Sequence, residues 1–343
     1  MRIHSRMTMN RCFILKRRPR GEPVSQDFAL LETPIPNPGP GEFVVRNRYV
    51  SLDPAQRGWM DDVASYMPPI PLGDPVRATT VGQVHVSANP DFAPGDWVLG
   101  LNAVEEYSLV ATGGFTQKID VSQCPSPSYF LSAMGAVGLT AYFALLDIGK
   151  PKRGETVLVS GAAGAVGSAV GQIAKIKGCR TIGIAGGPQK CARLIRDYGF
   201  DVAIDYRGKD GAALLAEIRA AAPTGIDIVF ENVGGMVLDA ALMNLAMRAR
   251  IILCGLIAEY NSEEKLGARN LWQLIVKRAT MQGFLIMDYV ERFAEGGGEV
   301  ARWIGEGRMR IDEDIVKGIE NAYPAFMKLF SGANQGKLIL GLA

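Results

Sequence analysis

Histidine and clustered cysteine, on which most metal centres and many nucleophilic mechanisms depend, are scarce in this chain of 343 residues. The only histidines are His4 and His85, so a three-histidine zinc site is excluded. The five cysteines are far apart and form no C-x-x-C pair, which argues against a disulfide framework and favours a reducing compartment. No G-x-S-x-G elbow is present, and His85 stands in an alternating pattern typical of a strand surface. We therefore predict no resident metal and a chemistry that depends on a borrowed cofactor.

Long apolar runs and an excess of one charge are also missing. No run reaches the roughly 18 residues that span a bilayer. The 37 basic and 35 acidic residues give a net charge of +2, without a basic–aromatic stripe for nucleic acid. We expect neither a membrane nor a nucleic-acid partner.

The first 21 residues are basic and contain no acid before Glu22, which admits two interpretations. One is an organelle presequence, which is typically rich in arginine and poor in acids. The other, which we favour, is an untargeted cytoplasmic chain that starts at Met1, Met7 or Met9, because the segment CFIL fits the first strand of the fold.

The length predicts two domains. Residues 1–132 contain short β-rich segments separated by Pro/Gly turns, as in a sandwich or barrel. Residues 133–311 alternate apolar strands with helical segments, which predicts an α/β domain with a doubly wound parallel sheet buried on both faces. Residues 312–343 contain a helical segment and a short strand, GKLILGLA, that we expect to complete the first domain.

A glycine-rich turn follows the apolar strand ETVLVSGA and opens a helix. Its residues Gly164, Ala165, Val166 and Gly167 belong to an A-x-G-x-x-G variant of the dinucleotide fingerprint, in which bare backbone and a helix N-terminus face a pyrophosphate. After the next strand, Gly186 and Gly187 stand where an acid would hold the ribose of NAD. Lys190 and Arg193 lie just beyond, so the sequence favours NADP over NAD.

The ordered motifs SLDPAQRGWM, SYMPPIPLGDPVRATTVGQV, SGAAGAVGSAVGQIAK, GIAGGPQK, FENVGG, CGLIAEYN and GANQGK carry a family resemblance. The chain resembles the zinc-independent medium-chain dehydrogenases/reductases of the leukotriene B4 12-hydroxydehydrogenase and prostaglandin reductase group. Within that group it is most similar to bacterial curcumin reductase-type double-bond reductases. The resemblance implies a GroES-like catalytic domain beside a Rossmann domain, NADPH as cofactor, and a homodimer built through the Rossmann sheets. It also implies reduction of the C=C bond of α,β-unsaturated ketones or aldehydes.

The resemblance also assigns residues to the cofactor. Lys190 matches the lysine that holds the 2′-phosphate, and Tyr206 matches a tyrosine near the adenosine. The other positions that match the cofactor lining are Asn232, Cys254, Gly255, Leu256, Ile257, Tyr260, Phe284, Leu285, Ile286 and Asn334.

Reduction of an enone leaves negative charge on the carbonyl oxygen, so the enzyme needs a hydrogen-bond donor there. Without a usable histidine, a tyrosine hydroxyl fits this role. Tyr260 follows the fifth strand of the series and is the first candidate, and Tyr66 in a Pro-rich loop of the first domain is the second. Arg57 and Met60 are candidates for the substrate cleft, although Arg57 equally fits a structural ion pair.

Two other function classes stay open at this point. The same hydride donor could serve a quinone, since the sequence does not separate quinones from enones or enals as substrates. A non-catalytic NADPH-binding sensor protein is the other alternative, and a tyrosine at a plausible cleft position argues against it.

Overall fold

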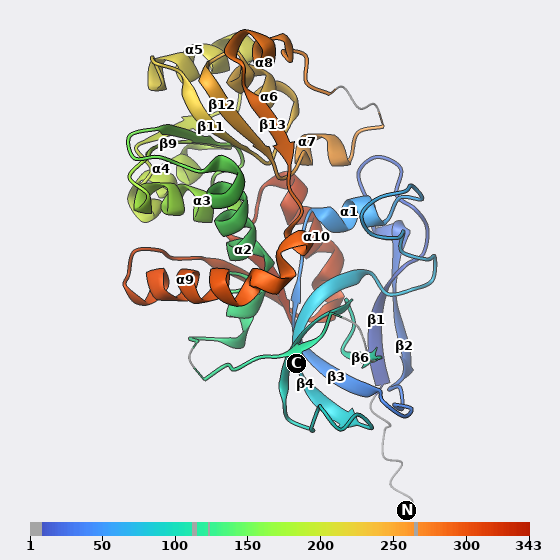
Figure 1. Ribbon diagram of the computed structural model, residues 1–343. Coiled ribbons are helices and arrows are strands. Elements are labelled where there is room, and N and C mark those ends of the chain that lie inside the picture. Colours follow the sequence, from blue (N-terminus) through green and yellow to red (C-terminus); the bar gives the residue numbers. More distant parts are fainter. Residues whose placement is uncertain (1–8, 112–114, 123, 264–266) are drawn as a thin grey trace, which may run out of the picture. The chain divides into compact units, whose positions relative to one another are not determined.

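The computed structural model describes residues 9–111, 115–122, 124–263 and 267–343 (Figure 1). His4 and the alternative starts Met1 and Met7 lie outside these residues. The chain divides into two compact units, which are described separately below. Unit 1 holds the described part of Met1–Leu131 together with Asp314–Ala333 and Leu338–Ala343, and unit 2 holds the described part of Ser132–Glu313 together with Asn334–Lys337.

The segment Asn334–Lys337 belongs to unit 2, whereas the sequence reasoning assigned all of 312–343 to the first domain. Gly336 forms a parallel bridge with Gly164, and the Lys337 N–H donates to the Asp312 carbonyl at 2.8 Å. These backbone contacts, which a sequence pattern does not reveal, attach the segment to the glycine turn of unit 2.

Unit 1 is built mainly of antiparallel strands. β1 and β2 form a two-stranded sheet, and a seven-stranded sheet has the order β14-β15-β3-β4-β5-β7, with β6 paired to β3. The strands are β1 (Met9–Leu15), β2 (Phe28–Pro34), β3 (Phe43–Ser51), β4 (Arg77–Ser87), β5 (Trp97–Ala103), β6 (Tyr107–Val110), β7 (Gln117–Lys118), β14 (Glu313–Lys317) and β15 (Lys337–Gly341). The helical elements are η1 (Ser25–Asp27), α1 (Ala55–Trp59), η2 (Pro127–Leu131), η5 (Ile319–Asn321) and α10 (Ala322–Ser331).

The core of unit 1 joins its N-terminal strands to its C-terminal helix. Leu15 and Val50 are fully buried and belong to one cluster with residues of α10. In α10, Ala322, Ala325 and Phe326 are buried, which is the i, i+3, i+4 spacing of one helix face. This helix therefore packs in the core of unit 1.

Unit 2 is an α/β unit in which neighbouring strands run parallel to each other. Its strands are β8 (Thr156–Val159), β9 (Arg180–Ala185), β10 (Val202–Asp205), β11 (Ile226–Glu231), β12 (Leu245–Leu253) and β13 (Thr280–Gly283). Its helical elements are α2 (Ala136–Phe143), η3 (Ala144–Gly149), α3 (Ala165–Ile176), α4 (Pro188–Tyr198), α5 (Gly211–Ala221), α6 (Gly235–Leu242), α7 (Ile257–Tyr260), α8 (Trp272–Lys277), η4 (Ile286–Arg292) and α9 (Phe293–Gly305).

The strand order β10-β9-β8-β11-β12-β13 is the doubly wound order of dinucleotide-binding folds. The direction of winding reverses between β8 and β11, and ligands of such folds bind at the carboxyl ends of the strands near this point. The α/β class and the doubly wound sheet predicted from the sequence are thus confirmed. In the described residues, no helix is both long and apolar enough to cross a membrane.

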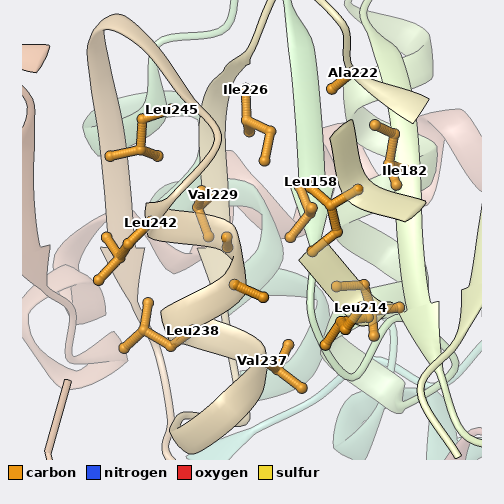
Figure 2. Packing of buried hydrophobic residues seen from close by; sticks show 14 of the residues in the cluster. Leu158, Ile182, Leu214, Ala222, Ile226, Val229, Val237, Leu238, Leu242 and Leu245 are labelled. Atoms are coloured by element: carbon orange, nitrogen blue, oxygen red, sulfur yellow. The ribbon is translucent and has the colours of Figure 1, made fainter. Parts of the chain in front are cut away.

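The core of unit 2 lies between the sheet and two of its helices. Figure 2 shows Leu158 and Val229 of the sheet together with Leu214 of α5 and Leu238 of α6. Leu158, Leu214 and Val229 are completely buried. Burial of each such side chain contributes about 1.5–3 kcal/mol to the stability of the fold. This core layer therefore helps to fix the strands whose carboxyl ends carry the site.

Close helix packing in unit 2 depends on a glycine in α3. A Cβ built on Gly171 would lie only 1.9 Å from Cζ of Phe200, and one on Gly183 would lie 3.0 Å from Cδ1 of the same ring. Phe200 is buried with 3% exposure, so its ring cannot move aside. We predict that Gly171→Ala lowers the free energy of unfolding by about 1–3 kcal/mol, measured by urea denaturation followed by circular dichroism.

Gly298 provides the matched control, because it is an exposed residue inside α9 with no atom within 4 Å of its added Cβ. Gly298→Ala should raise the free energy of unfolding by about 0.5–1 kcal/mol, the ordinary helix preference for alanine. A Gly171→Ala protein as stable as the Gly298→Ala protein would contradict the close packing.

Candidate functional site

The turn between β8 and α3 brings bare backbone to the carboxyl edge of the sheet. Gly164 caps α3 with extended backbone, and its N–H donates to the Gly161 carbonyl at 2.9 Å. A Cβ on Gly167 would lie 2.4 Å from that same carbonyl oxygen, so only glycine fits there. Ala165 and Val166 form the first turn of α3, where amide groups have no acceptor within the helix. This turn fits a pyrophosphate.

The turn between β9 and α4 also requires glycine. Gly187 has φ +97°, a conformation that other residues rarely adopt, and Pro188 begins α4. The Gly187 N–H donates to Oδ1 of Asp205 at 2.8 Å, which joins this turn to the end of β10. A Cβ on Gly186 would lie 3.2 Å from the hydroxyl of Tyr206, so the tyrosine expected near the adenosine lies beside the turn.

Lys190 lies in the first turn of α4 and is half-buried. Burial lowers the pKa of its ammonium group, and the positive charges of Arg207 and Arg193 lower it further. A half-buried cation beside other cations fits an anionic ligand. NADP carries such an anion in its 2′-phosphate.

Arg193 differs from the expectation that it serves the phosphate. Its guanidinium forms an ion pair with Asp312 at 2.7 Å and lies 3.7 Å from the carboxylate of Asp197. The hydroxyl of Tyr198 donates to the same Asp312 oxygen at 2.8 Å. The charge of Arg193 is therefore balanced within unit 2, where it links α4 to the segment before β14.

Arg207 is a residue that the sequence reasoning missed. A Cβ on Gly186 would lie 3.0 Å from Nε of Arg207, and one on Gly187 would lie 3.5 Å from a terminal guanidinium nitrogen. The guanidinium therefore lies over the turn of Gly186 and Gly187. The signal that could have identified it is its place two residues after β10, because the carboxyl ends of neighbouring parallel strands meet at one edge.

The turn after β11 holds Asn232 against the turn between β8 and α3. The side-chain amide of Asn232 donates to the Ser160 carbonyl at 2.8 Å, and its backbone N–H donates to the Ser160 hydroxyl at 2.7 Å. Glu231 is fully buried, and its Oε1 accepts from Ser160 Oγ at 2.7 Å and from the N–H groups of Val233 and Gly234 at 2.6 and 2.8 Å. Burial raises the pKa of Glu231, while these donors oppose the shift.

Tyr260 ends the short helix α7, which follows β12. Its hydroxyl oxygen accepts from the Leu256 N–H at 3.2 Å, and a Cβ on Gly255 would lie 3.1 Å from that oxygen. The N–H of Ile257 donates to the Asn232 carbonyl at 3.1 Å, which ties this segment to the turn after β11. The Tyr260 hydroxyl is thus held at the carboxyl edge of the sheet.

Cys254, the residue after β12, is not a nucleophile. Burial and the nearby charge of Glu231 raise the pKa of its thiol to about 12, so the group stays protonated at neutral pH. Its backbone N–H donates to the Glu231 carbonyl at 2.9 Å.

The remaining positions expected at the cofactor occur in two segments of unit 2. Phe284, Leu285 and Ile286 directly follow β13, and the Phe284 N–H donates to the Leu253 carbonyl at 3.1 Å. Asn334 donates through its side-chain amide to the Gly336 carbonyl at 2.9 Å, and Gly336 forms the bridge to Gly164. The structure therefore brings these positions to the same edge as the glycine turn.

Tyr66 lies in unit 1, within a loop that is closed at its base. The Ile70 N–H donates to the Trp59 carbonyl at 2.8 Å, and Arg18 donates to the carbonyls of Met60 and Ile70 at 2.7 and 3.2 Å. The Tyr66 ring is half-exposed, and its hydroxyl accepts from Nε1 of Trp59 at 3.1 Å. The loop thus holds Tyr66 in a defined position on unit 1.

Arg57 and Met60 lie in the interior of unit 1, which differs from the expectation that they line a cleft. Met60 is 1% exposed within the apolar cluster. Arg57 is 4% exposed, forms an ion pair with Asp61 at 2.7 Å and donates to the Gly21 carbonyl at 3.1 Å. These placements favour the structural ion pair for Arg57 and a packing role for Met60.

No group of three or more histidine, cysteine, aspartate or glutamate side chains able to hold a metal occurs in the described parts of the chain. His85 is exposed on β4 and packs edge-on against Tyr107, with ring centroids 5.2 Å apart.

The chain is similar to known oxidoreductases over nearly its whole length. A family model described as the N-terminal domain of oxidoreductase matches residues 11–119, and one described as zinc-binding dehydrogenase matches residues 165–301. The chain is 42% identical to the NADPH-dependent curcumin reductase of Escherichia coli, over 97% of each chain. It is 39% identical to the NADP(+)-dependent 2-alkenal reductase of Nicotiana tabacum, over 96% of this chain and 97% of the relative.

Among solved structures, the chain is similar to CurA from Vibrio vulnificus in complex with NADPH. The TM-score is 0.91 at 42% sequence identity, and the match covers 97% of this chain and 99% of the other.

Proposed function

The chain belongs to the zinc-independent group of medium-chain dehydrogenases/reductases that includes NADPH-dependent curcumin reductase and 2-alkenal reductase, and from this premise we propose that it reduces the C=C bond of α,β-unsaturated ketones and aldehydes. It is an NADP-dependent oxidoreductase. The observation that carries the finer proposal is a tyrosine hydroxyl, that of Tyr260, fixed at the edge of the sheet where dinucleotides bind.

The residues of unit 2 fit NADPH, because the turns after β8 and β9 carry glycines at positions where an added Cβ would be in close contact with neighbouring atoms. Their backbone is therefore bare. Gly164 and Gly167 would hold the pyrophosphate, and Lys190 the 2′-phosphate. When bound, NADPH supplies a hydride for the β-carbon of the substrate. Asn232, Phe284 and Asn334 would line the rest of the bound cofactor.

Tyr260 acts in this proposal as the donor to the carbonyl oxygen of the substrate, on which negative charge develops. The Leu256 N–H donates to the Tyr260 oxygen, which fixes the hydroxyl and polarises its O–H bond. The α-carbon takes a proton from solvent, so that one hydride and one proton together saturate the double bond. Tyr66 of unit 1 is the second candidate, with a role in holding the substrate.

A substrate panel tests the proposed function. We expect NADPH consumption with conjugated enones and enals, and product analysis should show a saturated C=C bond with the carbonyl retained. Secondary alcohols with NADP should give no turnover. Consumption restricted to quinones would favour the alternative reaction, and binding of NADPH without turnover of any of these compounds would favour the sensor.

Tyr260→Phe tests the donor with little change in volume. We predict that the rate of hydride transfer, measured in single-turnover experiments by NADPH absorbance, falls about 10²–10³-fold, as for loss of one oxyanion donor. NADPH affinity should change much less, and Tyr66→Phe should raise KM more than it lowers kcat. A normal single-turnover rate for Tyr260→Phe would remove Tyr260 from the mechanism, and a larger rate defect in Tyr66→Phe would transfer the role to the loop of unit 1.

We also propose that the enzyme is a homodimer in which a second copy binds to the exposed edge of the sheet in unit 2. In the described residues β13 pairs only with β12, so one side of β13 has backbone groups without a strand partner. The adjacent helix α8 exposes 67% of Trp272 and 64% of Ile275. An open strand edge beside exposed apolar side chains is complementary to its own copy across a two-fold axis.

Light scattering after size-exclusion chromatography measures this assembly. We expect the mass of a dimer for the parent chain and of a monomer for Trp272→Glu combined with Ile275→Glu. The control Leu109→Glu changes another exposed apolar residue, on β6 of unit 1, and should leave the dimer intact. An unchanged mass in the double variant would refute this interface.

A further inference from the structure

Two cations, Lys190 of α4 and Arg207 in the turn after β10, lie near each other beside the turn of Gly186 and Gly187. In the part of the chain that the structure describes, neither the ammonium of Lys190 nor the guanidinium of Arg207 forms an ion pair or a side-chain hydrogen bond. Lys190 is half-buried, so its charge is only partly solvated. Like charges placed together raise the free energy of the ligand-free protein, and the nearby carboxylate of Asp205 offsets only part of this cost. An anion that binds both cations removes more of it.

Asp205 holds Arg207 beside the turn of Gly186 and Gly187. Oδ1 of Asp205 accepts from the backbone N–H of Arg207 at 3.0 Å and from that of Gly187 at 2.8 Å. One carboxylate oxygen therefore fixes the backbone of both turns relative to each other. Lys209 donates to the Asp205 carbonyl at 2.6 Å and further restrains this segment.

The guanidinium of Arg207 lies against the bare backbone of the turn of Gly186 and Gly187. Gly186 and Gly187 have no side chains, and the positions that Cβ atoms would take there lie 3.0 and 3.5 Å from nitrogens of Arg207. A bulky side chain at either position would displace the guanidinium, and an acid would neutralise it. With glycine at both positions, the guanidinium stays beside the turn, and Arg207 is exposed to a ligand.

We propose that Arg207, together with Lys190, binds the 2′-phosphate of NADP(H) and selects it against NAD(H). The planar guanidinium matches two phosphate oxygens, and the ammonium contributes a point charge from α4. Two positive charges balance a phosphate monoester, which carries between one and two negative charges at neutral pH. NAD(H) offers only a hydroxyl at this position and leaves both cations without an anion.

Arg193 does not take this role, although the sequence places it closer to Lys190. Its ion pair with Asp312 and its contact with Asp197 already balance its charge. The second cation of the proposed phosphate site is therefore Arg207, which follows β10, although Arg193 is nearer to Lys190 in the sequence.

Calorimetric binding of two nucleotide fragments tests the assignment without any turnover. The fragment 2′,5′-ADP carries the 2′-phosphate and 5′-AMP lacks it. We expect Arg207→Ala to weaken binding of 2′,5′-ADP about 10- to 150-fold, the range for loss of a charge-assisted contact, and to leave 5′-AMP within about 2-fold. Arg207→Lys should recover part of the loss, and Lys190→Ala combined with Arg207→Ala should bind the two fragments almost equally.

Arg196→Ala is the matched control, because it removes one exposed cation of α4 that pairs with Asp197. It should leave both fragments unchanged. If Arg196→Ala weakened binding of 2′,5′-ADP as much as Arg207→Ala does, the loss would come from the change in net charge alone. That result would overturn the assignment. An equal loss of both fragments in Arg207→Ala, or no loss of either, would also overturn it. Because the readout is fragment binding, failure of the enone proposal would not affect this result.

Discussion

The buried carboxylate of Glu231 is the contact on which the arrangement of the site depends. It receives hydrogen bonds from the Ser160 hydroxyl and from the backbone of Val233 and Gly234, and so joins the turn after β8 to the turn after β11. These two strands flank the point where the direction of winding reverses. A buried acid without donors would be costly, so the backbone of the second turn must stay where it can donate. The positions of Asn232 and of the segment leading to Tyr260 follow from this restraint.

Sequence reasoning reached the backbone features of the site better than the side-chain pairing. Gly164, Gly167 and Gly187 were predicted because close backbone contacts or a positive φ favour glycine in such turns, and those limits act over a few residues of chain. Glycine at such positions is therefore readable from a local pattern. The parallel sheet was readable for a similar reason, since strands buried on both faces are continuously apolar.

The partners of charged groups were not readable in this way. Arg193 and Arg207 look alike as sequence, and the difference between them is that Asp312, more than a hundred residues away, lies beside only the first. The interior position of Met60 likewise depends on α10, which comes near the end of the chain. Pairing and burial are properties of distant contacts, so they need the folded structure.

The division of the chain has a consequence for how this protein can be dissected. The backbone passes between the units after Leu131, after Glu313, after Ala333 and after Lys337. Neither unit is a continuous stretch of chain, so neither can be excised as a cassette. A chain truncated before Asn334 would lack the Gly336 segment that bridges to Gly164, and a nucleotide-binding module cut at Glu313 would expose one side of its own glycine turn. Exchange of specificity with a relative is therefore a matter of grafting side chains rather than of swapping segments.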